Sequence, residues 1–74
     1  MQFNAIIEHD QDGFFAFIPE LKGCVSQGDT FEEALHNIKE ALQLYLEDMD
    51  EEERMRATKK DYIIAPIEIE LSHA

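Results

Sequence analysis

The sequence predicts an α+β domain with two layers, in which one long helix packs on an antiparallel sheet. Three observations indicate this fold class. Residues 2–9, 14–18 and 25–27 have the composition of strands, residues 31–48 have a helical period, and residues 67–71 alternate again between apolar and acidic side chains. The expected element order is β-β-β-α-β, because a helix and a sheet that each have one apolar face bury those faces against each other.

The first two strands are expected to form a hairpin. Residues 2–9 alternate well enough for a half-buried strand, and the Asp-Gln-Asp-Gly sequence of residues 10–13 is typical of a turn. The short connection makes the pairing with residues 14–18 antiparallel. Pro19 ends the second strand because it has no amide to donate to the ladder.

The second strand carries more large apolar side chains than one face of a sheet can take. Phe14, Phe15, Phe17 and Ile18 cannot all point inward, so either a second molecule covers the spare face or edge, or the helix does. We favour dimerisation. A chain of this length buries only roughly 60% of its unfolded surface, and small domains often compensate by self-association.

The helix over residues 31–48 has a clear start and one apolar stripe. Thr30, with Glu33 three residues later, forms the sequence pattern of a capping box. The apolar positions recur every three or four residues: Ala34, Leu35, Ile38, Ala41, Leu42, Tyr45, Leu46 and Met49.

An acidic run follows the helix, with six acids in the seven residues 47–53. Acids are unfavourable at a helix C-terminus, so the helix is expected to stop near Asp50. Asp50 with Glu53 then either caps a second short helix or belongs to a solvated loop. Beyond it, residues 62–65 are apolar, Pro66 interrupts them, and residues 67–71 are the expected last strand.

Composition limits the classes of function. The chain has 74 residues, with 17 acids against six Lys plus Arg and a net charge of −11, which repels nucleic acid and membranes and favours basic partners. Solubility is an equally good reason for this charge. Apolar runs of about 20 residues and a secretory signal are absent from the sequence, which predicts a cytoplasmic protein with a single domain, residues 1–74.

Residues suited to catalysis are few. Asp10, Asp12 and Glu20 are the acids that suit a Mg²⁺ cluster for phosphoryl chemistry, although aspartate in a hairpin turn is the commoner explanation. Cys24 is the single cysteine, which excludes an intrachain disulfide and is expected to be a buried structural thiol. The histidines lack metal-binding spacing: His9, His36 and His73. We therefore expect no enzyme activity, cofactor or metal.

Direct nucleic-acid binding is also not expected. Gly23 and Gly28 are not followed by the Lys-Ser/Thr of a phosphate-binding loop. Four basic residues cluster directly after the acidic run, where internal pairing explains them better than RNA or DNA contact: Arg54, Arg56, Lys59 and Lys60.

Several segments together resemble the HicB-like antitoxins. The similarity lies in residues 14–21 (Phe-Phe-Ala-Phe-Ile-Pro-Glu-Leu), Gly23-Cys24, residues 28–30 and 32–34, and the helical residues 37–41 and 44–46. It covers about two-thirds of the chain, roughly residues 2–48. Lys22 departs from the family pattern, which usually has proline before the glycine.

The resemblance implies a partial ribonuclease H-like fold that has lost its catalytic acids. It also implies a protein that binds and masks a small basic, mRNA-cleaving toxin of the HicA-like kind. Fuller family members carry a C-terminal DNA-binding domain, for which we expect no room in residues 1–74.

We expect masking to be steric and electrostatic, with the partner contacted by the acidic run: Glu47, Asp48, Asp50, Glu51, Glu52 and Glu53. A solvated run without a partner is the competing interpretation. Two other functions remain open. One is an orphan self-associating domain, as a homodimer or tetramer. The other is a metal-dependent nuclease built on Asp10, Asp12 and Glu20.

Overall fold

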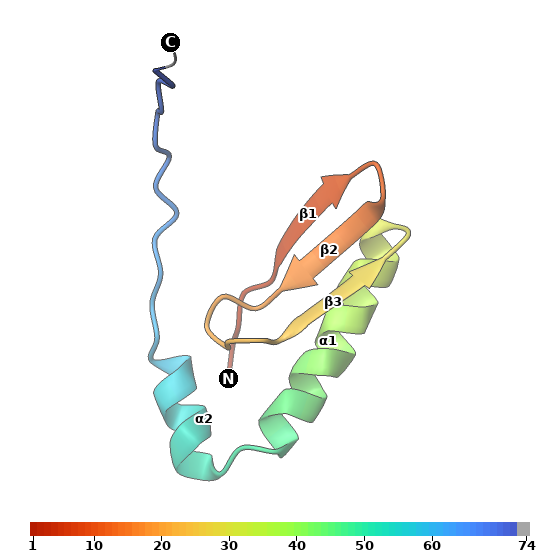
Figure 1. Cartoon of the computed structure of the whole chain (residues 1–74). Coiled ribbons are helices and arrows are strands. Elements are labelled where there is room, and N and C mark those ends of the chain that lie inside the picture. Colours follow the sequence, from red (N-terminus) through yellow and green to blue (C-terminus); the bar gives the residue numbers. More distant parts are fainter. Residues whose placement is uncertain (73–74) are drawn as a thin grey trace.

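The computed structural model describes residues 1–72 and confirms the two-layer α+β class (Figure 1). Strands β1 (Ile6–Asp10), β2 (Gly13–Phe17) and β3 (Val25–Gly28) form an antiparallel sheet in the order β1-β2-β3. Helix α1 (Phe31–Glu47) packs on one face of this sheet, and a second helix, α2 (Glu51–Thr58), follows it. Within the described residues, neither helix is long and apolar enough to cross a bilayer.

The strand register divides the large apolar side chains of β2 between the two faces of the sheet. Ala16 is fully buried and pairs with Ile7, so Phe14, Ala16 and Ile18 face α1. Phe15 and Phe17 therefore point away from the helix. They lie on a surface that we call the open face, made by Ile6, Phe15, Phe17 and Val25. The expectation that these aromatic residues cannot all point inward is confirmed.

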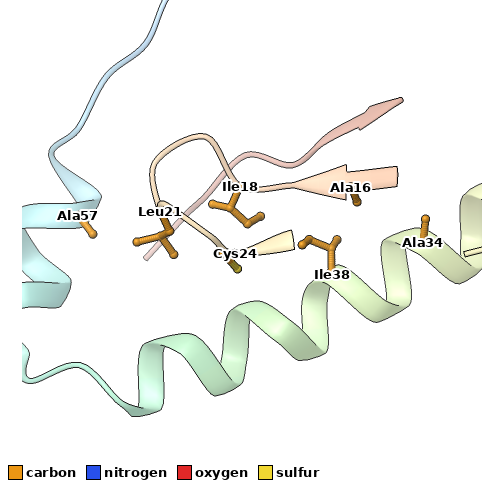
Figure 2. Close-up of a cluster of buried hydrophobic side chains, with 7 residues drawn as sticks. All are labelled: Ala16, Ile18, Leu21, Cys24, Ala34, Ile38 and Ala57. Atoms are coloured by element: carbon orange, nitrogen blue, oxygen red, sulfur yellow. The ribbon is translucent and has the colours of Figure 1, made fainter. Parts of the chain in front are cut away.

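The core between the sheet and α1 is small (Figure 2). Seven apolar residues are buried, and three of them are alanine: Ala16, Ile18, Leu21, Cys24, Ala34, Ile38 and Ala57. The large side chains among them are Ile18, Leu21 and Ile38, each at most 4% exposed. Larger residues of the α1 stripe, such as Leu42, Tyr45 and Leu46, complete the core from partly buried positions.

The start of α1 is fixed by local hydrogen bonds close to the predicted pattern. Thr30 Oγ1 accepts a hydrogen bond from the Glu33 amide at 3.0 Å. The Glu33 carboxylate reaches back one residue further than in a standard capping box, to the Asp29 amide at 3.1 Å. Side chains thereby satisfy the free amide of Glu33 in the first turn and the amide of Asp29 just before the helix.

The expected last strand is not formed, and this corrects the element order. Residues 60–72, which we call the C-terminal arm, have no regular secondary structure and are exposed throughout. The segment 67–71 has the alternation of a strand, but a strand also needs a neighbour to pair with. Helix α2 follows α1 in place of a direct return to the sheet. The arm extends from the end of α2 and does not contact the sheet as a strand (Figure 1).

Gly28 brings β3 directly against the start of α1. A Cβ atom added there would lie 2.5 Å from the Ala34 amide nitrogen and 2.9 Å from the Glu33 carbonyl carbon. Both neighbours are backbone atoms of a helix, which cannot move independently of the helix. The absence of a side chain at Gly28 therefore sets the distance between the two layers.

We predict that Gly28→Ala destabilises the protein by about 1–3 kcal/mol, because the added methyl group pushes α1 from the sheet. The free energy of unfolding, measured by urea titration with circular dichroism, checks this. Gln27→Ala is the matched control on the same strand, since the Gln27 side chain is exposed. Equal free energies of unfolding for the Gly28 and Gln27 variants would show that α1 can move away from the sheet without loss of stability.

Candidate functional site

The structure gathers the six predicted partner-binding residues at one corner of the molecule, where α1 ends and α2 begins. Helix α1 ends at Glu47, and Asp48 is its C-cap. Asp50 is the N-cap of α2, and its first turn is acidic. All six side chains are exposed, and we call this surface the acidic corner: Glu47, Asp48, Asp50, Glu51, Glu52 and Glu53.

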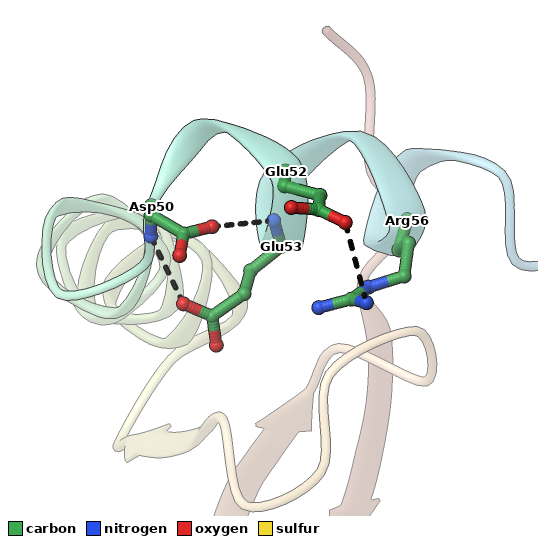
Figure 3. Close-up of polar contacts among 4 residues, drawn as sticks. All are labelled: Asp50, Glu52, Glu53 and Arg56. Carbon is green, nitrogen blue, oxygen red and sulfur yellow. Dashed lines mark hydrogen bonds and ion pairs between the residues drawn. The ribbon is translucent and has the colours of Figure 1, made fainter.

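Two of these acids hold the second helix in place (Figure 3). Asp50 Oδ1 accepts a hydrogen bond from the Glu53 amide at 2.8 Å, and Glu53 Oε1 accepts one from the Asp50 amide at 3.1 Å. This is the reciprocal capping box that the sequence left open as one of two alternatives. The solvated-loop alternative for this segment is wrong, since residues 51–58 are helical.

Helix α2 is anchored to the rest of the protein at two points. Ala57 is buried and belongs to the same core cluster as Leu21 (Figure 2). Arg54 Nε donates a hydrogen bond to the Leu46 carbonyl at 2.8 Å, which satisfies one of the free acceptors at the end of α1. The acidic corner therefore has a defined shape, although it is fully on the surface.

The charges of the corner are only weakly compensated. Glu52 and Arg56 form an ion pair at 3.9 Å with both side chains largely exposed, a geometry that contributes little to stability. Arg54 is directed to the Leu46 carbonyl. Within residues 1–72, the carboxylates of Glu47, Asp48 and Glu51 have no hydrogen bond or ion pair. These three are the acids that remain available to a partner.

Internal pairing of the basic residues is only partly confirmed. Of the four in the segment after the acidic run, Arg56 has the ion pair with Glu52 and Arg54 binds a carbonyl. Lys59 and Lys60 are exposed at the end of α2, and neither has an ion pair within the described part of the chain.

The acids of the nuclease alternative do not come together. Asp10 Oδ1 accepts a hydrogen bond from the Asp12 amide at 2.8 Å, which is the local turn bond expected for aspartate. Glu20 lies beyond the other end of β2, is 6% exposed, and accepts hydrogen bonds from Asn4 N and Nδ2, both at 3.2 Å. Across residues 1–72, no three His, Cys, Asp or Glu side chains are grouped to hold a metal ion.

A second acidic surface was missed by the sequence reasoning. It is an open hollow of about 540 Å³ between the hairpin tip and the start of α1, with Asp10, Asp12, Asp29 and Glu33 at its border. Three separate segments contribute these residues, so no run of acids signals the site in the sequence. Asp10 and Glu33 already accept backbone hydrogen bonds there.

The contacts of His9 and His36 and the burial of Cys24 are those of residues in ordinary surface and core positions. His36 Nε2 lies 2.6 Å from Glu40 Oε1 on the exposed side of α1, as expected for a surface histidine. His9 stacks on Phe14 with ring centroids 3.9 Å apart, and His73 lies outside the described residues. Cys24 is buried, as predicted, and burial raises the pKa of its thiol by disfavouring the thiolate.

The chain is similar to a family of antitoxins and to several bacterial proteins. The profile of a family described as the HicB-like antitoxin of bacterial toxin-antitoxin systems matches residues 3–70. A UPF0150 protein of Helicobacter pylori (strain J99) is 59% identical over 69 residues, which cover 93% of this chain and 96% of that protein.

More distant relatives extend the comparison. A UPF0150 protein of Synechocystis is 47% identical over 68 residues, which cover 90% of this chain and 85% of the relative. An uncharacterised 14.9 kDa protein of Haemophilus phage HP1 is 33% identical over 85 residues, covering 99% of this chain and 64% of the phage protein. No solved structure matches significantly.

We predict that Asp50→Ala loosens α2, because the Glu53 amide loses its acceptor, at a cost of about 1 kcal/mol. Amide hydrogen exchange at Glu53 and Arg54 should become faster, and this is the measurement. Asp48→Ala is the matched control: it removes the same charge from the corner but no capping bond, and it relieves an acid at a helix C-terminus. Unchanged exchange in the Asp50 variant would contradict the capping role.

We also predict that Cys24 resists thiol reagents in the native protein, because it is buried and protonated at neutral pH. Its rate of modification should rise to that of a free thiol in denaturant. A Cys24→Ala, Gln27→Cys variant, with an exposed thiol on the same strand, serves as the reactive control. Equal rates for the two native proteins would mean that β3 opens readily.

Proposed function

Because this chain belongs to the HicB-like antitoxin family, we propose that it binds a small basic, mRNA-cleaving toxin of the HicA-like kind and masks it without catalysis. Membership of an antitoxin family implies a toxin partner in general terms. The identity of that toxin and the mode of contact are parts of the proposal. We place the contact in the cytoplasm, where mRNA is the toxin's substrate.

The acidic corner is the observation that carries the proposed mode of contact. An RNA-cleaving protein needs a basic surface to bind the phosphate backbone. Glu47, Asp48 and Glu51 present carboxylates that the described chain leaves unpaired, so they can accept hydrogen bonds from Arg or Lys side chains in place of phosphate. Masking then follows from direct competition for the same cations.

The fixed geometry of the corner supports this role. The capping box and the contact of Arg54 with Leu46 order α2, so the backbone that carries the carboxylates is in place before a partner arrives. A preorganised surface loses less conformational entropy on binding than a flexible acidic tail. The net charge of −11 adds long-range attraction that speeds the encounter with a basic protein.

The corner is a better candidate than the acidic hollow at the hairpin tip. In the hollow, Asp10 and Glu33 already accept backbone hydrogen bonds, so part of its negative charge is engaged. Two acids of the hollow, Asp12 and Asp29, are unengaged within the described residues, whereas the corner has three unengaged acids among its six and so presents the larger negative charge to a partner. The two surfaces lie at opposite ends of the long axis of α1, which allows them to be tested separately (Figure 1).

A non-catalytic role is consistent with the family and with the separation of the carboxylates. Asp10 and Asp12 lie at the hairpin turn, whereas Glu20 is buried beyond the other end of β2 and is engaged with Asn4. A metal-dependent nuclease needs its acids around one ion. The masking proposal needs none of these three residues.

We predict that the tagged protein captures one small basic protein from its own cell lysate at low salt and releases it at high salt, because screening weakens attraction between exposed charges. The measurement is mass spectrometry of the captured material, followed by titration of the purified pair. The triple variant Glu47→Gln, Asp48→Asn, Glu51→Gln should bind about 10- to 100-fold more weakly, since three exposed charge contacts are lost.

The control removes the same number of charges away from the corner, through Asp12→Asn and Asp29→Asn at the hollow and Glu8→Gln in the middle of β1, and should retain most of the affinity. If the control variant lost affinity and the corner variant kept it, the contact would lie near the hairpin, and the proposal that the acidic corner binds the toxin would be wrong. Capture of no basic protein would contradict toxin masking and favour an orphan self-associating domain.

A further inference from the structure

The C-terminal arm has one completely apolar face in spite of its exposure. In an extended chain, alternate side chains point to the same side. The odd-numbered residues from 63 to 71 are all apolar, and the large ones are 70–89% exposed: Ile63, Ala65, Ile67, Ile69 and Leu71. Nothing else in residues 1–72 exposes so many large aliphatic side chains in one row.

The backbone of the arm is better suited to pairing along one edge than along the other. In a strand, the amides and carbonyls of alternate residues point to the same edge, so the odd-numbered residues share one edge and the even-numbered residues the other. Pro66 is even-numbered and has no amide, whereas every odd-numbered residue of this segment has one. Proline is tolerated in an edge strand when its nitrogen faces solvent.

The sheet offers one edge that is free to receive a strand. Strand β1 pairs only with β2, and its other edge has no backbone hydrogen bond to another element within residues 1–72. The opposite edge is less available, because Asn37 Nδ2 of α1 donates to the Gln27 carbonyl of β3 at 2.8 Å. The five residues of β1 also match the length of the alternating segment 67–71.

The open face of the sheet provides one apolar row that reaches that edge, while Glu8 lies on the same face of β1 one row further along. Ile6, Phe17 and Val25 form one row across the three strands, and the row ends at Ile6 on β1. Val25 is 49% exposed and Phe15, on the adjacent row, is 41% exposed. A strand added beyond β1 with its odd-numbered side chains on this face would continue the row.

We propose that two copies of this chain form a dimer by exchanging their C-terminal arms, each arm pairing as an edge strand with β1 of the other copy. The arm stands clear of its own sheet, and a reciprocal exchange about a two-fold axis satisfies both arms and both edges at once (Figure 1). Each arm carries four large side chains on its apolar face. At roughly 60–120 Å² per side chain, the arms and the surfaces that receive them bury on the order of 1,000–2,000 Å², the size of a specific interface.

The salt dependence of this dimer has the opposite sign to that of toxin binding. Each copy carries a net charge of −11, so two copies repel each other and association depends on apolar and main-chain contacts. Added salt screens the repulsion and tightens the dimer, whereas it weakens the contact with a basic toxin. The arm exchange and the proposed function can therefore fail independently of one another.

The test is the mass of the full chain in solution, measured by analytical ultracentrifugation over a wide range of concentration and at two salt concentrations. We expect twice the mass of one chain, with tighter association at high salt. Ile67→Ser with Ile69→Ser should weaken the dimer at least about 100-fold, because four apolar side chains per dimer are lost. Glu68→Ser with Glu70→Ser, on the other face of the same segment, should leave the dimer intact or tighten it.

The fold of each variant is checked by circular dichroism, and it should be unchanged because the arm residues are exposed in the single chain. A mixed sample of isotope-labelled and unlabelled chains should show filtered nuclear Overhauser contacts from the Ile69 methyl groups of one copy to the Ile6 methyl groups of the other. The mass of one chain at all concentrations would overturn the proposal. So would a dimer that is indifferent to the Ile67 and Ile69 changes, or arm contacts confined to the same chain.

Discussion

The close approach of β3 to α1 at Gly28 and Ala34 is the constraint on which the other features depend. Small residues at this contact and at Ala16 let the helix lie directly on the sheet, so the direction of α1 is set at its first turn. The other end of the same 17-residue helix places the acidic corner. The far end of α1 is held where Tyr45 Oη donates a hydrogen bond to the Lys22 carbonyl at 2.7 Å. A bulky contact at one end of the domain would therefore displace the candidate binding surface at the other end.

The features that could be predicted from the sequence are those decided by neighbouring residues. The hairpin turn at residues 10–13, the cap at Thr30 and the capping box at Asp50 depend on side chains that bond to backbone groups two or three residues away. The last strand, which was expected but is not formed, depends on residues far away in the sequence. Its alternation is a property of residues 67–71 alone, but pairing also depends on where α2 delivers the chain, and no local pattern contains that information.

The candidate site was predictable in composition but not in detail. Six acids in seven positions are plain in the sequence, yet they are not equivalent: two of them cap a helix, one pairs with Arg56, and three remain unengaged within the described residues. The spacing of Asp50 and Arg54 suits an ion pair, but Arg54 binds the Leu46 carbonyl because the last turn of α1 leaves acceptors without donors. Backbone carbonyls and carboxylates compete for the same Arg side chains, and only the three-dimensional structure shows which carboxylates remain without a partner.

The position of Pro66 has a consequence for how this chain avoids uncontrolled aggregation. A row of exposed aliphatic side chains on an extended segment is ordinarily a template for endless strand stacking and fibre growth. Pro66, Glu68 and Glu70 share the even-numbered positions, so they interrupt one edge of the arm with a missing donor and place two like charges on its second face. The missing donor and the two charges disfavour the addition of a further strand at this edge. The same segment therefore combines an apolar face that favours strand pairing with residues that disfavour open-ended stacking.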